Sequence, residues 1–423
     1  MVDRKKLSTY VLSFAQDPVE PRLMFMGTEN GLYFSIDAGA TWTHWTNGYP
    51  NGVSTMDMKI HPREYDLVIG TFGRDIYILD DIRPLRAIAH DGIQLLDQTI
   101  HAFQPPVAYE VSTKGAPGLF AGGDSYFHGQ NRPLGAMITF SVKEGDTLAG
   151  QLKVSASRRG MGSPANMKKF AKAKKVKVQI FDNKGNLVRT LTKIPKTGIN
   201  RFVWRFDTKG YRFPGRPKPK AGAPEQGGGP SVFPGTYKLV FSYQGQKDST
   251  MLTVKPDPRM TLNLDAMKAD RVLVINGLKK VQVLAEAMDR IKESKKTMME
   301  VKKMIPKGKK PTDQIKALRK ISKTVSDSLK AISEVLFPDK NIQGIYSNPK
   351  LVTNKMRGAY SAIYDMQPLT ENQKLALKQT VTIVENTVKR IQQFYDGPWN
   401  AYREAAEKVN LTPFKNYKPL KLE

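Results

Sequence analysis

Apolar and polar residues change their spacing twice along this chain. Between residues 87 and 256 they alternate, or run apolar, over strand lengths separated by turn residues. The clearest of these strands are residues 135–142, 175–181, 200–206 and 236–243. Residues 182–186, Asp-Asn-Lys-Gly-Asn, have the composition of a hairpin turn. This pattern predicts a β-sandwich of the immunoglobulin-like type.

From about residue 261 onward the apolar residues recur every three or four positions, which is typical of helices with one buried face. Two such stripes are Ile315, Leu318, Ile321, Val325, Leu329, Ile332 and Leu336, and then Leu377, Val381, Val384, Val388, Ile391 and Tyr395. Thr370 and Gln373 have the spacing of a capping box. We therefore expect four or five helices, the first from about residue 264 to 303, packed as an antiparallel bundle.

The first hundred residues contain an internal repeat. Residues 14–34 and 59–79 share a proline turn, a strand that ends in Gly-Thr, and a strand centred on tyrosine. Their offset of 43 to 44 residues lies within the roughly 40–50 residues of a β-propeller blade. Two blades cannot close a propeller, which typically has about 4–8. We therefore expect residues 1–86 to dock against further blades, from a preceding polypeptide or from a separate subunit. Two blades alone could hardly cover four large apolar side chains: Phe34, Trp42, Trp45 and Tyr77.

A turn motif lies in the first repeat, where five residues follow the pattern Ser-x-Asp-x-Gly-x-Thr-Trp: Ser35, Asp37, Gly39, Thr41 and Trp42. We expect Asp37 to accept hydrogen bonds from backbone amides two or three residues further on. Gly39 can adopt the positive φ that the turn needs, and Trp42 can fill space between sheets. The pattern resembles the Asp-box, or bacterial neuraminidase repeat, which marks the rim of a propeller blade and does not by itself indicate an enzyme.

The order of blades, sandwich and helices resembles the C-terminal half of large bacterial Asp-box exoproteins, which have sortilin-like propellers and are described as glycosyl hydrolase-like. The stretches that carry the resemblance are residues 67–82, 198–204, 234–237 and 257–259. It implies a secreted, periplasmic or cell-surface protein. It also implies three parts: two blades at 1–86, the sandwich at 87–256 with a lysine-rich and a flexible Pro/Gly-rich insert, and the bundle at 257–423.

The chain is strongly basic, with 67 Lys and Arg against 39 Asp and Glu and a net charge of +28. The densest cluster is Lys168, Lys169, Lys172, Lys174 and Lys175, a candidate polyanion site. A solvated basic surface is the first interpretation, and an acidic glycan or cell-surface component is the second. Nucleic acid is the least favoured partner, because no stacking aromatic residues are interleaved with the lysines and no nucleic-acid module is recognisable.

No catalytic, cofactor or metal site is predicted. The chain has no cysteine, and its five histidines show no metal-ligand spacing. Asp80 and Asp81 are adjacent, so on a strand they would point to opposite faces, whereas glycoside hydrolysis usually needs two carboxylates that flank a groove. Four residues have the types found in sialidase sites, but structural roles are favoured for them: Arg74, Tyr77, Arg83 and Arg86.

These observations favour a non-catalytic, extracytoplasmic binding or scaffold protein, the C-terminal part of a blade assembly that recognises protein or glycan partners. The alternative is a glycoside hydrolase acting on polysaccharide, with its active site mainly in blades outside this chain. Residues 1–6 are basic, but the stretch that follows does not have the apolar core of a signal peptide. No run approaches the roughly 18 apolar residues of a membrane span.

Overall fold

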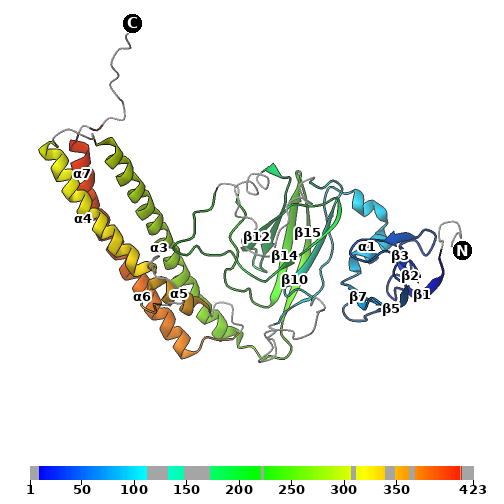
Figure 1. Cartoon of the computed structure of the whole chain (residues 1–423). Coiled ribbons are helices and arrows are strands. Elements are labelled where there is room, and N and C mark those ends of the chain that lie inside the picture. The colour runs from blue at the N-terminus through cyan, green and yellow to red at the C-terminus, as the bar shows by residue number, and fades with distance from the viewer. Residues whose placement is uncertain are drawn as a thin grey trace, which may run out of the picture. The chain divides into compact units, whose positions relative to one another are not determined.

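The computed structural model describes residues 9–111, 132–146, 172–220, 223–305, 311–338, 348–361, 367–409 and 411. The chain divides into two compact units. The first comprises Met1–Lys209, Gly222–Glu225 and Ser231–Thr261, and the second comprises Gly210–Ala221, Gln226–Pro230 and Leu262–Glu423. The first is built mainly of sheets and the second of helices (Figure 1). The expected β-rich part followed by a helical part is therefore present.

Two small antiparallel sheets open the first unit. One has the order β1-β2-β3-β4 and consists of Val11–Gln16, Met24–Thr28, Gly31–Ser35 and Thr43–Trp45. The other has the order β5-β6-β7 and consists of Thr55–Ile60, Leu67–Thr71 and Ile76–Leu79. They bury a shared apolar cluster that includes Phe25, Leu32, Met58, Leu67 and Ile69. Burial of this cluster removes large apolar side chains from water and so stabilises both sheets together.

The repeat extends to the strand pairing. Gly27 pairs with Leu32 in the first sheet, and Gly70 pairs with Ile76 in the second. In the next row, Met26 pairs with Tyr33, and Ile69 pairs with Tyr77. The first strands also match, since β1 and β5 each shift register after the first paired residue. Successive residues of a strand point to opposite sides of its sheet. Each sheet therefore has one face that contains the glycine, Gly27 or Gly70, and we call this its glycine face. The opposite face contains the tyrosine, Tyr33 or Tyr77, and we call this its tyrosine face.

Opposite faces of the two sheets meet. The glycine face of the first sheet, with Phe25, Leu32 and Phe34, packs against the second sheet. The face of the second sheet in this contact is its tyrosine face, which carries Met58, Ile69 and Tyr77. The first sheet's tyrosine face, with Phe14, Met26 and Tyr33, lies on the other side of that sheet. The second sheet's glycine face, with Val68, Ile76 and Ile78, likewise lies away from the cluster.

The apolar residues left uncovered are not those expected from the sequence. Trp42, Trp45, Phe34 and Tyr77 are all half-buried, and the last three pack against the shared cluster. Side chains that are 39 to 76% exposed lie instead along the outer faces and turns of the two sheets: Tyr10, Val11, Leu12, Phe14, Met56, Phe72, Ile76 and Ile78.

A second pair of sheets forms the rest of the first unit. Their strands and the preceding helices are α1 (Arg83–Asp91), η1 (Ile93–Asp97), β8 (His101–Ala102), β9 (Ala108–Glu110), β10 (Ala136–Val142), β11 (Val176–Phe181), β12 (Leu187–Lys193), β13 (Gly198–Trp204), β14 (Gly235–Tyr243) and β15 (Gln246–Pro256). The sheet orders are β13-β10-β8 and β12-β11-β14-β15-β9. Both contribute to one apolar cluster, in which Phe140, Trp204 and Phe241 are fully buried. The four expected strands correspond to β10, β11, β13 and β14, and β12 and β15 extend the pattern.

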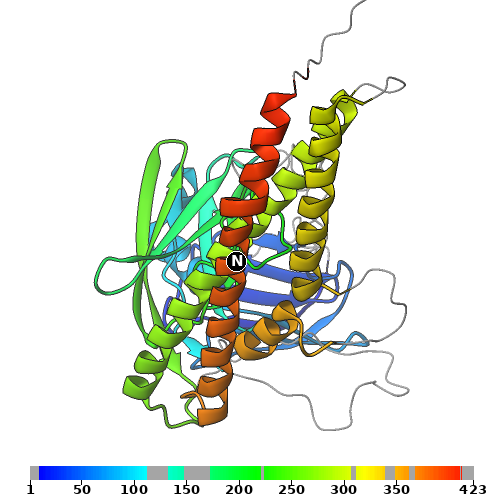
Figure 2. The same ribbon diagram turned by 90° about the vertical axis from the view of Figure 1, so that its left-hand side faces the viewer.

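The second unit contains α3 (Leu264–Met304), α4 (Asp313–Leu336), α5 (Val352–Tyr360), α6 (Glu371–Phe394), the π-helical turn η3 (Tyr395–Trp399) and α7 (Asn400–Lys408). Figure 2 shows α6, η3 and α7 as a nearly continuous rod. Thr370 and Gln373 form the predicted capping box. Buried residues of both predicted stripes line one cluster, including Leu318, Val325, Val384 and Ile391.

The Pro- and Gly-rich insert, expected to be a flexible loop of the sandwich, belongs in part to the second unit. Arg212 forms an ion pair of 2.6 Å with Asp289 of α3. Phe213 packs edge-on against Tyr360 of α5. Both residues directly precede the insert at 214–230, and within it a Cβ atom at Gly215 would lie 3.0 Å from the Phe337 ring.

Gly27 is required by the contact between the first two sheets. A Cβ atom there would lie 2.2 Å from Ser13 Oγ and 2.6 Å from the Thr55 carbonyl oxygen. Gly70 occupies the equivalent position in the second sheet, and there the nearest atom to such a Cβ is the Asp57 carbonyl oxygen at 3.8 Å. Glycine is therefore required for packing at position 27, whereas position 70 has room for a Cβ atom.

We predict that Gly27→Ala lowers the free energy of opening of these sheets by about 1–3 kcal/mol, because the added methyl forces β1 and β5 apart. Gly70→Ala is the matched control and should change it by less than about 0.5 kcal/mol. Native-state hydrogen exchange of the β2 and β6 amides measures both values. Equal effects of the two substitutions would contradict this account of the sheet contact.

Candidate functional site

The turn after β3 is closed by the side chains of Ser35 and Asp37. Asp37 accepts hydrogen bonds from the Thr41 amide at 2.8 Å and the Thr41 hydroxyl at 2.6 Å. The Ser35 hydroxyl donates to Asp37 at 2.7 Å and accepts from the Gly39 amide at 2.9 Å. The amide bound by Asp37 is therefore four residues on, not two or three as expected. Gly39 has φ +85°.

The groups around Asp37 shift its pKa in opposite directions. Partial burial alone would raise the pKa of Asp37, but the hydrogen bonds from Ser35 and Thr41 outweigh it and lower the pKa. Trp42 follows the turn and meets Phe14 edge-on, with ring centroids 6.4 Å apart. These contacts describe a local structural turn.

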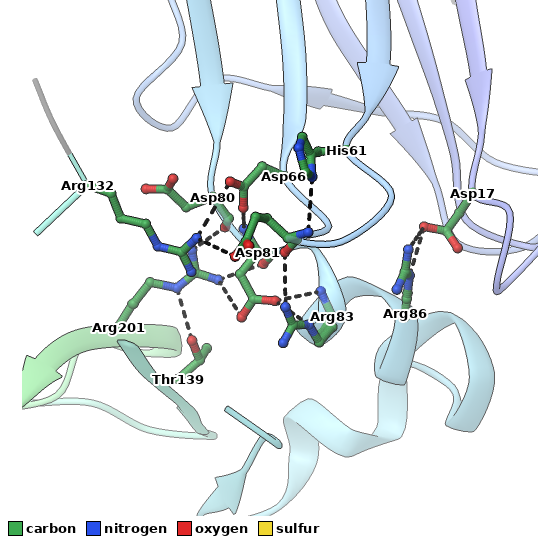
Figure 3. Close-up of polar contacts among 11 residues, drawn as sticks. Asp17, His61, Asp66, Asp80, Asp81, Arg83, Arg86, Arg132, Thr139 and Arg201 are labelled. Carbon is green, nitrogen blue, oxygen red and sulfur yellow. Dashed lines mark hydrogen bonds and ion pairs between the residues drawn. The ribbon is translucent and has the colours of Figure 1, made fainter. Parts of the chain in front are cut away.

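A second polar cluster surrounds the end of β7, where Asp80 and Asp81 follow the strand (Figure 3). Asp81 has φ +50°, a left-handed conformation that aspartate tolerates better than most residues. Its amide donates to Asp66 at 2.8 Å. Asp81 as a whole is 2% exposed, and its carboxylate forms an ion pair of 3.0 Å with Arg83. Burial raises the pKa of Asp81, against the opposing effect of Arg83 and Arg201.

Arg201, from β13, reaches this turn from the other pair of sheets (Figure 3). Its guanidinium donates to the carbonyl oxygens of both Asp80 and Asp81, the latter at 2.8 Å. Its Nε donates to the Thr139 hydroxyl at 3.0 Å, and the Asp81 carboxylate lies 3.9 Å away. Burial lowers the pKa of Arg201, while both aspartates oppose that shift. The residue therefore connects the end of β7 with β10 and β13.

Asp80 stands at the open side of the cluster. Burial, together with the nearby charge of Asp66, raises its pKa. Arg132 approaches from the same side and pairs with Glu64 at 3.4 Å and with Asp66 at 3.6 Å. The carboxylates here are thus interleaved with arginines. This arrangement stabilises a chain turn.

The four residues with sialidase-type chemistry are not assembled into one site. Arg83 and Arg86 both lie over the Tyr65 ring, at 5.0 and 4.0 Å from its centroid. Arg86 is also buried against Asp17 in an ion pair of 2.8 Å. Arg74 is exposed in the turn before β7, and Tyr77 packs in the shared apolar cluster.

The remaining candidates also occupy separate places. Of the histidines, His44 stacks on Tyr33, His101 pairs with Asp248 at 3.4 Å, and His128 lies outside the described residues. Within the described ranges, no group of three or more His, Asp or Glu residues could hold a metal ion. Among the lysines, Lys168 and Lys169 lie outside the described residues, Lys172 and Lys174 are exposed, and Lys175 is half-buried.

Sequence reasoning did not find Arg201, Arg132, Glu64 and Asp66 as members of this cluster. A single arginine within the apolar strand 198–204 was the available signal. Its partners lie 120 and 121 residues away, and only the three-dimensional pairing of β13 with β10 brings Arg201 beside Thr139.

No protein-family model and no curated protein matches this chain. Two solved structures match part of it, and both are extracellular domains of BT4673 from B. thetaiotaomicron. The first, described as a one component system, has 11% identity and a TM-score of 0.15, covering 59% of this chain and 25% of that chain. The second, described as a hybrid two component system, has 11% identity and a TM-score of 0.14, covering 60% and 26%.

The chain thus spans about a quarter of each of these structures. Among the helices of the described ranges, none is long and apolar enough to cross a membrane.

We predict that Asp37→Ala lowers the stability of the first two sheets by about 1–3 kcal/mol, because the Thr41 amide loses its acceptor. Hydrogen exchange of the β3 and β4 amides measures the change. Glu29→Ala, at an exposed position in the turn between β2 and β3, is the control. A loss of partner binding at unchanged stability would show that Asp37 acts in recognition instead.

We predict that Arg201→Met lowers the stability of the first unit by about 2–3 kcal/mol, because two carbonyl oxygens lose their donor and the buried Asp81 carboxylate loses a nearby positive charge. Arg74→Met removes the same charge at an exposed turn and should cost less than about 0.5 kcal/mol. Thermal unfolding of both full-length variants provides the comparison. If the two variants melt alike, Arg201 does not hold the turn.

Proposed function

We propose that this chain is a non-catalytic, extracytoplasmic binding or scaffold protein, and that its first two sheets are β-propeller blades that work docked against further sheets. The observation that carries the proposal is the exposure of apolar side chains on both outer faces of this pair. Phe14 is 55% exposed on one side, and Ile76 and Ile78 are 69% and 59% exposed on the other. Contiguous apolar surfaces of this kind usually mark an interface.

The charge of the sheet pair fits such an interface. The whole chain carries +28. Residues 9–79, by contrast, hold eight acidic residues against four basic ones, namely Asp17, Glu20, Glu29, Asp37, Asp57, Glu64, Asp66 and Asp75 against Arg22, Lys59, Arg63 and Arg74. The basic excess therefore lies elsewhere in the chain. These basic residues would lie on the surface of the assembly outside the proposed interface, and so they would not repel a partner there.

The other parts would serve assembly and recognition. In this proposal the β8–β15 sheets are an immunoglobulin-like sandwich, the second unit is an antiparallel bundle, and residues 35–42 are an Asp-box. The sequence resemblance to bacterial Asp-box exoproteins supports these assignments and the extracytoplasmic location. The basic surface, including Lys172 and Lys174, would face an acidic glycan or cell-surface component.

The further sheets would come from a preceding polypeptide or from a separate subunit. The alternative, a glycoside hydrolase, would need its active site in those other sheets. The Asp80 and Asp81 pair gives that alternative no support, because Asp81 is 2% exposed and both residues hold arginine partners through carboxylate or carbonyl oxygens.

We predict that, in the isolated full chain, the amides of β1 and β7 exchange with solvent faster than those of β12 and β13, because the outer faces of the first two sheets lack their cover. All four strands are sheet edges, so β12 and β13 serve as matched internal controls in one mass-spectrometric hydrogen-exchange experiment. Sedimentation velocity of the same sample reports association. A soluble monomer with β1 and β7 as protected as β12 and β13 would show that no partner is needed.

A further inference from the structure

The two uncovered faces of the sheet pair are of different kinds. On the outer, tyrosine face of the first sheet Phe14 is 55% exposed and Tyr33 is half-buried, whereas Met26 between them is 2% exposed. The second sheet exposes its glycine face, on which Ile76 and Ile78 are exposed beside Val68. One copy of the chain therefore offers one free face of each kind.

The buried contact inside the chain shows how these two kinds of face fit together. There, a glycine face lies on a tyrosine face, and both are covered: Leu32 is 1% exposed and Met58 is 3% exposed. Strand pairing makes Ile76 the equivalent of Leu32, and Phe14 the equivalent of Met58. Each free face thus repeats one half of a contact that the chain already makes.

We infer that copies of this chain stack head to tail, with the free glycine face of one copy covering the free tyrosine face of the next. The inference rests on the proposed function and names the separate subunit as a second copy. Such a contact is heterologous, so each added copy again leaves one face of each kind free. Assembly continues until the rotation between copies closes a ring, or it grows as a filament.

The internal contact also fixes the register of the stack. Thr55 lies over Gly27, and its carbonyl oxygen accepts a hydrogen bond of 3.0 Å from Ser13. By strand pairing, Val11 is the equivalent of Thr55, Gly70 of Gly27, and Asp57 of Ser13. Val11 is 53% exposed, and the nearest atom to a Cβ at Gly70 is the Asp57 carbonyl oxygen at 3.8 Å. The backbone of Val11 in one copy should therefore cross Gly70 of its neighbour, next to Asp57.

The stack should be weaker than the internal contact. Asp57 and Lys59 on β5 replace Ser13 and Ala15 on β1 at the edge of the glycine face. These charged side chains must be desolvated or displaced when a second sheet approaches. We therefore expect association that is reversible and depends on protein concentration.

Disulfide trapping tests this register cleanly, because the chain contains no cysteine of its own. Full-length Val11→Cys and Asp57→Cys variants are mixed and oxidised, and cross-linked dimers are measured by mass spectrometry. The expected result is a Val11-to-Asp57 cross-link in clear excess. Val11→Cys mixed with Leu187→Cys is the control, since Leu187 is 50% exposed on β12, away from both faces. A yield equal to this control, or cross-links only between two copies of the same variant, would overturn the inference.

Sedimentation velocity of the wild type and of Gly70→Ala gives an independent measurement. A methyl at Gly70 leaves the isolated chain undisturbed but meets the neighbour's Val11 backbone, so association should weaken about tenfold or more. A monomeric wild type whose β1 and β7 amides exchange rapidly would refute stacking of copies and leave the proposed function standing. A monomer with both strands protected would refute both.

Discussion

The guanidinium of Arg201 is the interaction on which the first unit depends. It binds two successive carbonyl oxygens at the end of β7 and the hydroxyl of Thr139 on β10. A guanidinium presents several donors in one rigid plane, so it can satisfy a turn and a neighbouring strand at once. The turn in question contains Asp81 in a left-handed conformation, with its carboxylate buried. Without these donors the turn would carry unpaired carbonyl oxygens into a site that water reaches poorly.

The same arginines surround the carboxylates of this cluster with positive charge. A catalytic pair of carboxylates needs distinct environments and access to substrate. Here Arg83, Arg132 and Arg201 are spread among Glu64, Asp66, Asp80 and Asp81, and Asp81 is closed off from solvent. The raised pKa of Asp80 has an ordinary cause in burial and in the adjacent charge of Asp66. The charged residues of this cluster connect the end of β7 to the β13-β10-β8 sheet.

Local patterns in the sequence predicted much of the secondary structure because they arise from local physics. The capping box at Thr370, the stripe through Val325 and the strand alternation in residues 236–243 each depend on neighbours within a few positions. The membership of Arg201 in the polar cluster could not be predicted in this way, since its contacts span more than a hundred residues. The sequence also does not show which aromatic residues remain exposed, because Trp45 and Tyr77 become partly buried only when the two sheets pack together.

The second sheet stops at β7, and within the described residues no further strand pairs with it. Its last strand therefore keeps a row of bare backbone donors and acceptors next to two exposed isoleucines, a combination that invites cross-β growth between chains. Carboxylates flank this strand, with Asp75 before it and Asp80 and Asp81 after it. Charges at the ends of an apolar strand act as gatekeepers, because repeating them every 4.8 Å or so along a fibril is costly. Of these three residues Asp75 is exposed and Asp81 is buried against Arg83, so the Asp75 carboxylate is the charge that opposes cross-β pairing at this open edge.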